Sequence, residues 1–234
     1  MNKTKIEWTD YSWNPLTGCN NGCDYCYANS IFKRFGKSFK PTFHLDRLKD
    51  IDKITKPCKV FVCSVADLWG DFDSLETLAY VGDLLERIRQ SKYGHITFQL
   101  LTKRPEKLAA SPMLFPANVW VGTTVTNWQE TKRIDDLRKG VMGALKFVSF
   151  EPLLSHFSEE DLDLTGIKWV IIGAMTGQPK SRLVKPKEDW IFDIVKECDK
   201  KGIPIYMKNS LREYGELRRE FPTQGINLKN KGEK

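Results

Sequence analysis

The chain has 234 residues, of which 41% are hydrophobic and 29% are charged, and its formal net charge is +7. This composition is ordinary for a globular protein, and the length suits a single α/β barrel domain. The N-terminal lysines precede no apolar run, and the longest apolar stretch, from Trp169 to Met175, is too short to span a membrane. We therefore expect a soluble, cytoplasmic protein with no signal peptide and no membrane partner. It would form one domain over residues 1–234, with residues 209–234 as a basic C-terminal extension.

Three of the six cysteines, Cys19, Cys23 and Cys26, lie within eight residues at the spacing C-x3-C-x2-C. In a reducing compartment, clustered cysteines more often bind metal or take part in catalysis than form disulfides. Gly18 and Gly22 give the loop the freedom to wrap around a small group. A structural zinc site needs four ligands, and no fourth cysteine or histidine lies nearby in the sequence. An iron–sulfur cluster with one open iron is therefore predicted, and three zinc-binding or buried cysteines are the alternative.

Six short apolar runs, rich in β-branched and aromatic residues, predict strands farther along the chain. The runs are continuous rather than alternating, which is typical of strands that are buried on both faces of a parallel sheet. In chain order they cover residues 59–68, 95–101, 119–125, 145–150, 168–173 and 203–207.

Amphipathic stretches between these runs predict helices. Asp73 and Glu76 resemble a capping box, followed by a stripe of Leu75, Leu78, Val81, Leu85 and Ile88. Asn127 with Glu130 repeats the start signal, and a third helix is expected over residues 190–201 before a glycine. Strands that alternate with helices predict an α/β fold, specifically a partial or full parallel (β/α) barrel.

Polar residues follow the predicted strands at their carboxyl ends, where such barrels carry their chemistry. The ordinary alternative is that loops are polar in any protein. We expect these residues to converge on one rim although they are far apart in the sequence. They include Ser64, Asp67, Thr102, Lys103, Thr126, Asn127, Glu151 and Lys208.

The cysteine spacing, with the aromatic Tyr25 before the last cysteine, resembles the signature of the radical SAM superfamily. The resemblance implies a [4Fe–4S] cluster on Cys19, Cys23 and Cys26, whose open iron binds S-adenosylmethionine (SAM). It implies reductive cleavage of SAM to a 5′-deoxyadenosyl radical that abstracts hydrogen from a substrate. The electron would come from a donor such as flavodoxin or ferredoxin. The implied fold is a partial or full parallel (β/α) barrel.

Further motifs resemble a phage- and prophage-associated family that is distantly similar to spore photoproduct lyase, a DNA-repairing radical SAM enzyme. Two positions depart from that family. Residues 173–175 read Gly-Ala-Met where the family tends to have Gly-Gly-Glu, and Thr126 stands where it tends to have Glu. The superfamily's Gly-Gly-Glu after the second strand is also absent, and residues 64–67 occupy that place. The motifs are IEWTD at 6–10, WNP at 13–15, CYA at 26–28, LTKRP at 101–105 and SFEPLL at 149–154.

The expected cofactor-binding residues are Tyr25 and the polar strand-end residues. Glu151 is the sharpest case, because it ends a predicted strand directly before Pro152. Its carboxylate could hold the ribose hydroxyls or the amino group of SAM in place of the missing Glu. The alternative is an ion pair with Lys103 or Lys208 that only shapes the rim.

The remaining cysteines are expected to be structural. Cys63 lies inside an apolar run, where burial is the expectation and a radical-quenching role is the alternative. Cys58 and Cys198 are dispersed in the sequence, so a second cluster is not expected.

The sequence therefore predicts a radical SAM enzyme. The basic charge and the resemblance favour a nucleotide or nucleobase substrate, free or within DNA. One alternative is a non-catalytic iron–sulfur or zinc protein that binds nucleic acid. Another is a radical enzyme that acts on a peptide or a small metabolite. Cleavage of SAM would separate an enzyme from a binding protein.

Overall fold

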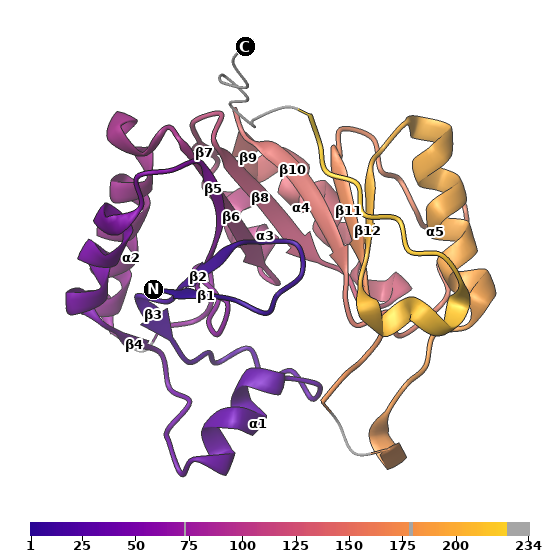
Figure 1. Cartoon of the computed structure of the whole chain (residues 1–234), viewed down its shortest axis with the longest axis horizontal. Coiled ribbons are helices and arrows are strands. Elements are labelled where there is room, and N and C mark those ends of the chain that lie inside the picture. Colours follow the sequence, from indigo (N-terminus) through magenta and orange to yellow (C-terminus); the bar gives the residue numbers. More distant parts are fainter. Residues whose placement is uncertain (73, 178–179, 224–234) are drawn as a thin grey trace, which may run out of the picture.

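The computed structural model describes residues 1–72, 74–177 and 180–223. Its centre is an eight-stranded sheet in the order β1-β2-β5-β6-β8-β10-β11-β12 (Figure 1). All neighbours in this sheet are parallel except β1 and β2. The strands are β1 (Asn2–Lys3), β2 (Tyr11–Trp13), β5 (Cys58–Val62), β6 (Ile96–Thr102), β8 (Val119–Thr124), β10 (Leu145–Phe150), β11 (Trp169–Ile172) and β12 (Ile205–Met207).

Two small strand pairs flank this sheet. They are β3 (Leu16–Thr17) with β4 (Thr42–Phe43), and β7 (Met113–Leu114) with β9 (Val141–Met142). The helices are α1 (Tyr27–Arg34), α2 (Leu75–Arg89), α3 (Pro105–Ala110), α4 (Lys132–Gly140) and α5 (Glu188–Lys201), and short 3₁₀ helices cover Leu45–Lys53, Ser91–Tyr93, Trp128–Glu130, Lys180–Arg182 and Asn209–Tyr214.

The sheet curves strongly around a small aromatic cluster. In a flat sheet, β5 and β11 would lie about 19 Å apart, because neighbouring strands are about 4.8 Å apart. Yet the ring of Trp8 lies 4.7 Å from that of Phe61 in β5 and 6.1 Å from that of Trp169 in β11. The hydroxyl of Tyr206 in β12 also donates to the carbonyl of Glu7. The predicted α/β fold with a parallel, barrel-like sheet is thus confirmed.

The larger core lies between the sheet and the helices. Val81, Leu84 and Ile88 of α2 and Ile191 and Ile194 of α5 are buried there. The prediction for α2 needs two corrections. Its first turns project beyond the core, so Leu75 and Leu78 are exposed. Its cap is the hydroxyl of Ser74, which accepts from the backbone N–H groups of Glu76 and Thr77; Asp73 lies outside the described residues.

The predicted strand over residues 59–68 is shorter in the structure, and the difference shapes the site. It ends at Val62 because Cys63 has a positive φ of 56°, a value that breaks an extended strand. The chain then turns, with the N–H of Ala66 donating to the carbonyl of Cys63. The turn places Ala66 beside Gly18 in an isolated parallel bridge. Residues 64–67 therefore lie against the cysteine loop.

Candidate cofactor site

The three clustered cysteines lie in the loop between β3 and α1. The N–H of Gly18 donates to the carbonyl of Val65, and that of Cys19 to the carbonyl of Phe39. Gly18 has a φ of +81°, and a Cβ atom there would lie 2.2 Å from the carbonyl oxygen of Lys40. Only glycine fits this position. At the other end, Cys26 caps α1, its sulfur accepting from the N–H of Asn29.

All three thiols are free and line one cavity of about 420 Å³. Burial is the main cause that raises the pKa of the Cys19 thiol to about 11, with smaller contributions from the carboxylate of Asp67 and the thiols of Cys23 and Cys26. Burial also raises the pKa of Cys23, while the charge of Lys103 acts in the opposite direction. The three sulfurs are thus close enough to interact electrostatically, and one cation faces them.

The predicted rim residues come together in this same cavity. Besides the cysteines, its walls include Tyr25, Ser64, Asp67, Thr102, Lys103, Glu151 and Lys208. They come from the ends of β5, β6, β10 and β12 and from the cysteine loop. Only the parallel topology gathers residues so far apart in sequence on one rim.

Asp67 is the hydrogen-bond centre on one side of the cavity. Its Oδ1 accepts from the hydroxyl of Thr102 at 2.7 Å and from the N–H of Trp69 at 3.0 Å. Its Oδ2 accepts from the N–H of Lys103 and from the side-chain amide of Asn21, both at 2.9 Å. Asp67 is 6% exposed as a residue, and both of its carboxylate oxygens accept hydrogen bonds from protein donors. Asp67 therefore ties the end of β6 to the cysteine loop.

Ser64 and Tyr27 join the turn after β5 to the start of α1. The hydroxyl of Tyr27 in α1 donates to the carbonyl of Ser64 at 2.9 Å. The hydroxyl of Ser64 donates to the side chain of Asn14 at 3.1 Å. Desolvation around its hydroxyl raises the pKa of Tyr27 to about 12, although the residue as a whole is 46% exposed.

Glu151 and Lys208 form an ion pair on the opposite side of the cavity. Their side chains are 25% and 19% exposed. The partner of Glu151 is Lys208, one of the two lysines considered from the sequence. Gly173 makes room for the pair, since a Cβ atom there would lie 3.1 Å from Lys208 and 3.2 Å from Glu151. Oε2 of Glu151 has no hydrogen-bond partner among the described residues.

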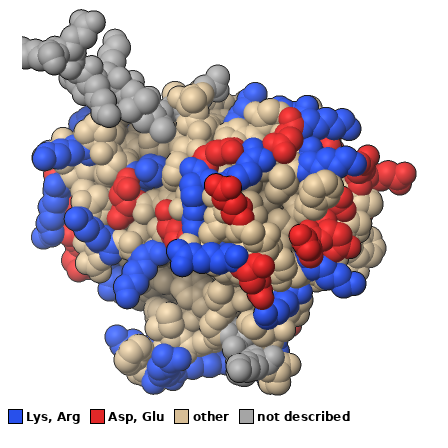
Figure 2. Space-filling model, turned by 45° about the vertical axis from the view of Figure 1, so that its right-hand side comes forward, with Lys and Arg blue, Asp and Glu red and all other residues tan. Residues whose placement is uncertain are grey.

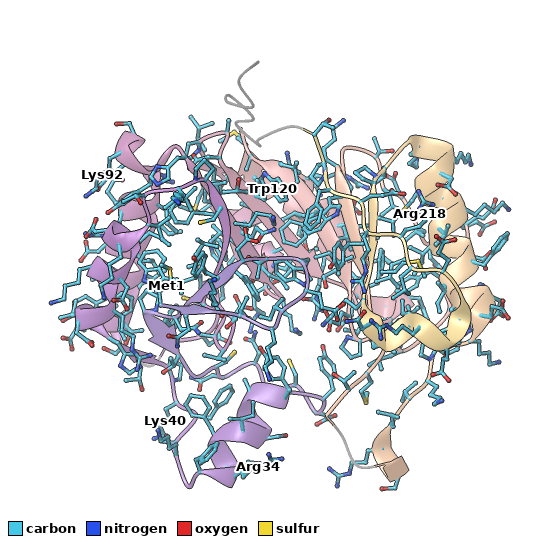
Figure 3. All side chains as sticks on the ribbon, viewed as in Figure 1. Met1, Arg34, Lys40, Lys92, Trp120 and Arg218 are labelled. Atoms are coloured by element: carbon cyan, nitrogen blue, oxygen red, sulfur yellow. The ribbon has the colours of Figure 1, made fainter. Side chains whose placement is uncertain are left out.

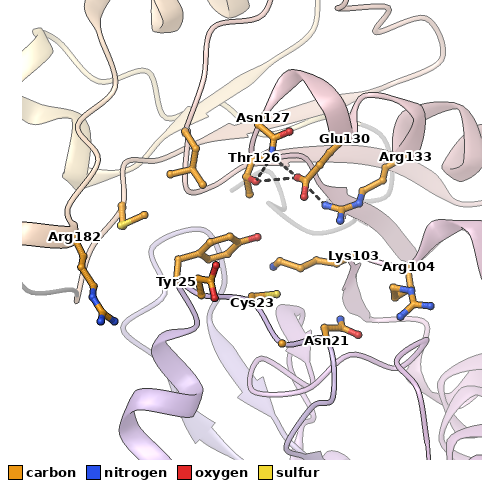
Figure 4. A pocket seen from close by; sticks show the side chains of 14 residues that line it. Asn21, Cys23, Tyr25, Lys103, Arg104, Thr126, Asn127, Glu130, Arg133 and Arg182 are labelled. Carbon is orange, nitrogen blue, oxygen red and sulfur yellow. Dashed lines mark hydrogen bonds and ion pairs between the residues drawn. The ribbon is translucent and has the colours of Figure 1, made fainter.

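A second, larger cavity of about 780 Å³ adjoins the first (Figure 4). The two cavities share a boundary, because five residues line both of them: Asn21, Cys23, Tyr25, Lys103 and Met175. At this boundary the ammonium of Lys103 lies over the ring of Tyr25, 5.4 Å from its centroid. Burial raises the pKa of Tyr25, and the neighbouring Cys23 and Glu130 raise it further.

Thr126 and Asn127 line the second cavity rather than the first. Both N–H and hydroxyl of Thr126 donate to Oε2 of Glu130, at 2.7 and 2.9 Å. Arg133 pairs with the same oxygen at 2.7 Å. These bonds, drawn as dashed lines in Figure 4, connect the end of β8 to the first turn of α4.

The donor set can be tested against the kind of metal group it would hold. In the described part of the chain, no three His, Cys, Asp or Glu side chains converge to hold a single metal ion. A four-iron cluster asks for a different arrangement, because each thiolate binds its own iron around a larger object. Three free, soft donors around one cavity, with space beside them, fit such a cluster better than a single zinc ion.

The other cysteines lie away from this loop. Cys63 and Cys198 are buried, in accord with the structural expectation. Cys58 is half-buried at the start of β5, at the opposite end of that strand from the cavity. Cys58 and Cys198 do not line either cavity.

Two functional features were missed by sequence reasoning. Asn21 lies between two of the cysteines, but nothing in the sequence indicates that it bonds to Asp67. The second cavity depends on Arg133 and Arg182, which come from α4 and from the segment after β11. Lys and Arg are frequent in the chain, so no pattern singled these two out.

The family model described as "Protein of unknown function (DUF5131)" matches residues 3–231. No curated protein sequence matches the chain significantly. Among solved structures, the chain is similar to a Tyr-to-Phe variant of spore photoproduct lyase, with a TM-score of 0.52 and 13% identity over 77% of this chain and 61% of that chain. It is also similar to a Cys-to-Ala variant with a dinucleoside spore photoproduct, with a TM-score of 0.50 and 13% identity over 74% and 58%.

The chain therefore spans about three-fifths of the length of these lyases. At 13% identity the likeness shows that the chain shares its fold with these lyases. No helix among the described residues is long and apolar enough to cross a membrane.

Proposed function

The chain belongs to the DUF5131 family, and we propose that it is a radical SAM enzyme. The observation that carries this proposal is one cavity at the carboxyl ends of parallel strands, lined by Cys19, Cys23 and Cys26 and by the Glu151–Lys208 pair. The shared fold with spore photoproduct lyase supports it. We place the activity in the cytoplasm, and the phage association suggested by the sequence motifs is part of the proposal.

The three cysteines would hold a [4Fe–4S] cluster. When bound, the cluster supplies the electron that cleaves SAM and so provides a radical for hydrogen abstraction. Backbone contacts hold the loop in one conformation. The N–H groups of Gly18 and Cys19 donate to the carbonyls of residues 65 and 39, and Gly18 packs against the backbone of residue 40. Asp67 fixes Asn21 between the first two cysteines. The chain's own contribution is therefore a preorganised set of thiolates.

The Glu151–Lys208 pair would bind SAM. SAM carries an amino group, a carboxylate and ribose hydroxyls, and a mixed acid–base pair can engage groups of both signs. Oε2 of Glu151 is free among the described contacts, and the carboxylate can accept from an ammonium or a hydroxyl. Lys208 can in turn face a carboxylate. This assignment fills the role of the Gly-Gly-Glu motif that the chain lacks.

The substrate we propose is a nucleotide or nucleobase, free or within DNA. Support comes from the basic charge of the chain and from the structural likeness to a lyase variant with a dinucleoside spore photoproduct. The electron donor we propose is an acidic protein such as flavodoxin or ferredoxin. It would dock on α1, which Cys26 caps and which lies beneath the sheet in the view of Figure 1.

The surface of α1 suits an acidic partner. Ile31 and Phe35 are 43% and 69% exposed and lie one turn apart on the same face. Arg34 and Lys40, which Figure 3 labels near α1, add positive charge to this surface. Residues 27–40 contain no Asp or Glu. An eight-residue helix is about 12 Å long, so this whole surface lies within short reach of Cys26.

Formation of 5′-deoxyadenosine tests the proposed function. Anaerobically reconstituted protein with a reductant should cleave SAM, and the Cys19/Cys23/Cys26→Ala variant should not. The matched control is a Cys58/Cys198→Ala variant, which removes two thiols that do not line the cavities and should keep iron and cleavage. Equal cleavage in the two variants, or none in iron-loaded wild type, would reject the proposal.

A further inference from the structure

We propose that the 780 Å³ cavity binds the phosphate-bearing part of the substrate, with Lys103 and Arg182 as its anchoring cations. The inference deepens the proposed function, on which it rests, because it commits the substrate to a phosphorylated form, a nucleotide or nucleic-acid strand. A nucleoside or a bare base would lack the anchored group.

The size and position of the cavity fit a substrate site. Small-molecule sites in proteins are clefts of roughly 300–1,000 Å³, and a volume of about 780 Å³ is enough for a nucleotide. It shares a boundary with the cysteine cavity, formed by Asn21, Cys23, Tyr25, Lys103 and Met175. A substrate held here would therefore lie next to the site where we place the cluster and SAM.

The charges in the lining favour an anion. Four cations line the cavity, Lys103, Arg104, Arg133 and Arg182, against two carboxylates, Asp24 and Glu130. The cations are not equally available. Arg104 is paired with two carboxylates outside the cavity, and Arg133 is paired with Glu130.

Lys103 and Arg182, by contrast, have no ion pair within the described residues. A cation without a carboxylate partner is free to meet a phosphate. The basic segment near the C-terminus differs in this respect, because Arg218 pairs with Asp199 and Glu220, and Arg219 pairs with Glu7. These two arginines are thus less available to a phosphate than Lys103 and Arg182 are.

The arrangement in Figure 4 suits an extended anion rather than a single point charge. Arg182 lies on one side of Tyr25, and Lys103 and Arg133 lie on the other side. Phosphates on both sides of a nucleotide would each meet a cation, with Tyr25 between them.

Figure 2 shows a hollow between the main body and the lower part of the molecule, with Lys and Arg side chains along its edge.

Anaerobic binding of a labelled short single-stranded oligonucleotide to the holoenzyme tests the inference. At low salt, Arg182→Gln and Lys103→Gln should each weaken binding by about tenfold, and Arg182→Lys should restore most of it. The matched control is Lys56→Gln, an exposed lysine before β5 at the opposite end of the strands. Unlabelled mononucleotides should compete for the site, and the corresponding nucleosides should not.

Iron content and SAM cleavage, measured on the same preparations, separate the two proposals. If wild type cleaves SAM but binds no phosphorylated probe, the inference is wrong and the proposed function stands. The inference is also wrong if Arg182→Gln and Lys56→Gln bind alike, or if nucleosides compete as well as nucleotides. If wild type holds no iron and cleaves no SAM, the proposed function fails, and phosphate binding alone would not restore it.

Discussion

The two sides of the cysteine cavity use their polar strand ends in different ways. After β5 and β6, Asp67 is buried and all its contacts are donors of the protein itself. After β10 and β12, Glu151 and Lys208 form one half-buried pair, and an oxygen of Glu151 has no partner among the described residues. The first side builds the cysteine loop, and the second side is available to a ligand. Position at a strand end thus indicates proximity to the site, while the hydrogen-bond partners indicate the role.

The largest effect is expected on stability, from a substitution of Asp67 on the first side of the cavity. Asp67→Ala would leave buried donors of Thr102, Trp69 and Lys103 unpaired, so the free energy of unfolding should fall by about 3 kcal/mol. The cysteine loop should also hold iron less well. Urea unfolding and iron analysis would measure both.

The matched control for Asp67→Ala is Asp71→Ala. Asp71 is a nearby carboxylate that pairs with Arg104 and Lys107 at the surface. Exposed pairs contribute little, so this variant should keep stability and iron. Equal losses in the two variants would contradict the structural role given to Asp67.

A substitution on the second side of the cavity should weaken ligand binding and leave the stability of the fold unchanged. Glu151→Gln should keep the fold and the iron but weaken SAM binding by roughly tenfold, which is the loss of one charged hydrogen bond. Anaerobic calorimetry would measure this affinity. Glu213→Gln, which breaks the exposed pair with Lys185, is the matched control. Unchanged SAM affinity in Glu151→Gln would remove this residue from the site.

Gly173 offers a smaller perturbation of the same pair. In Gly173→Ala the added Cβ would crowd Lys208 and Glu151 at 3.1 and 3.2 Å and shift their side chains. We expect SAM affinity to fall by about threefold, since the shift is a few tenths of an ångström and both charges remain. Gly82→Ala in α2, where nothing lies within 4 Å, should leave the affinity unchanged. The same affinity in both variants would mean that the pair tolerates displacement.

The smallest effect is expected from α1, which lies outside both sides of the cavity, and it concerns the rate of reduction by the electron donor. An Ile31/Phe35→Ser variant should be reduced a few-fold more slowly by flavodoxin, because it loses exposed apolar contact area. Reduction by dithionite, which needs no docking surface, should be unchanged. Stopped-flow absorbance would follow both reactions. An equal rate with flavodoxin in wild type and variant would place the donor elsewhere.

The sequence predicted the elements of this site better than their connections. The cysteine loop and the strand ends were recognisable because spacing and apolar runs are local patterns. The turn after Val62 was not, since it depends on a positive φ at Cys63, which an apolar run conceals. The bond between Asn21 and Asp67 joins residues 46 positions apart. Contacts of this kind follow from the packing of loops, which no periodicity encodes.

The iron and acid-labile sulfide content of anaerobically purified wild-type protein tests the central claim most directly. Three thiolates around one cavity with an open position predict about four irons and four sulfides per chain. A brown protein with this composition would support the cluster on Cys19, Cys23 and Cys26. Stoichiometric zinc without iron, after purification and reconstitution under strict exclusion of oxygen, would contradict it.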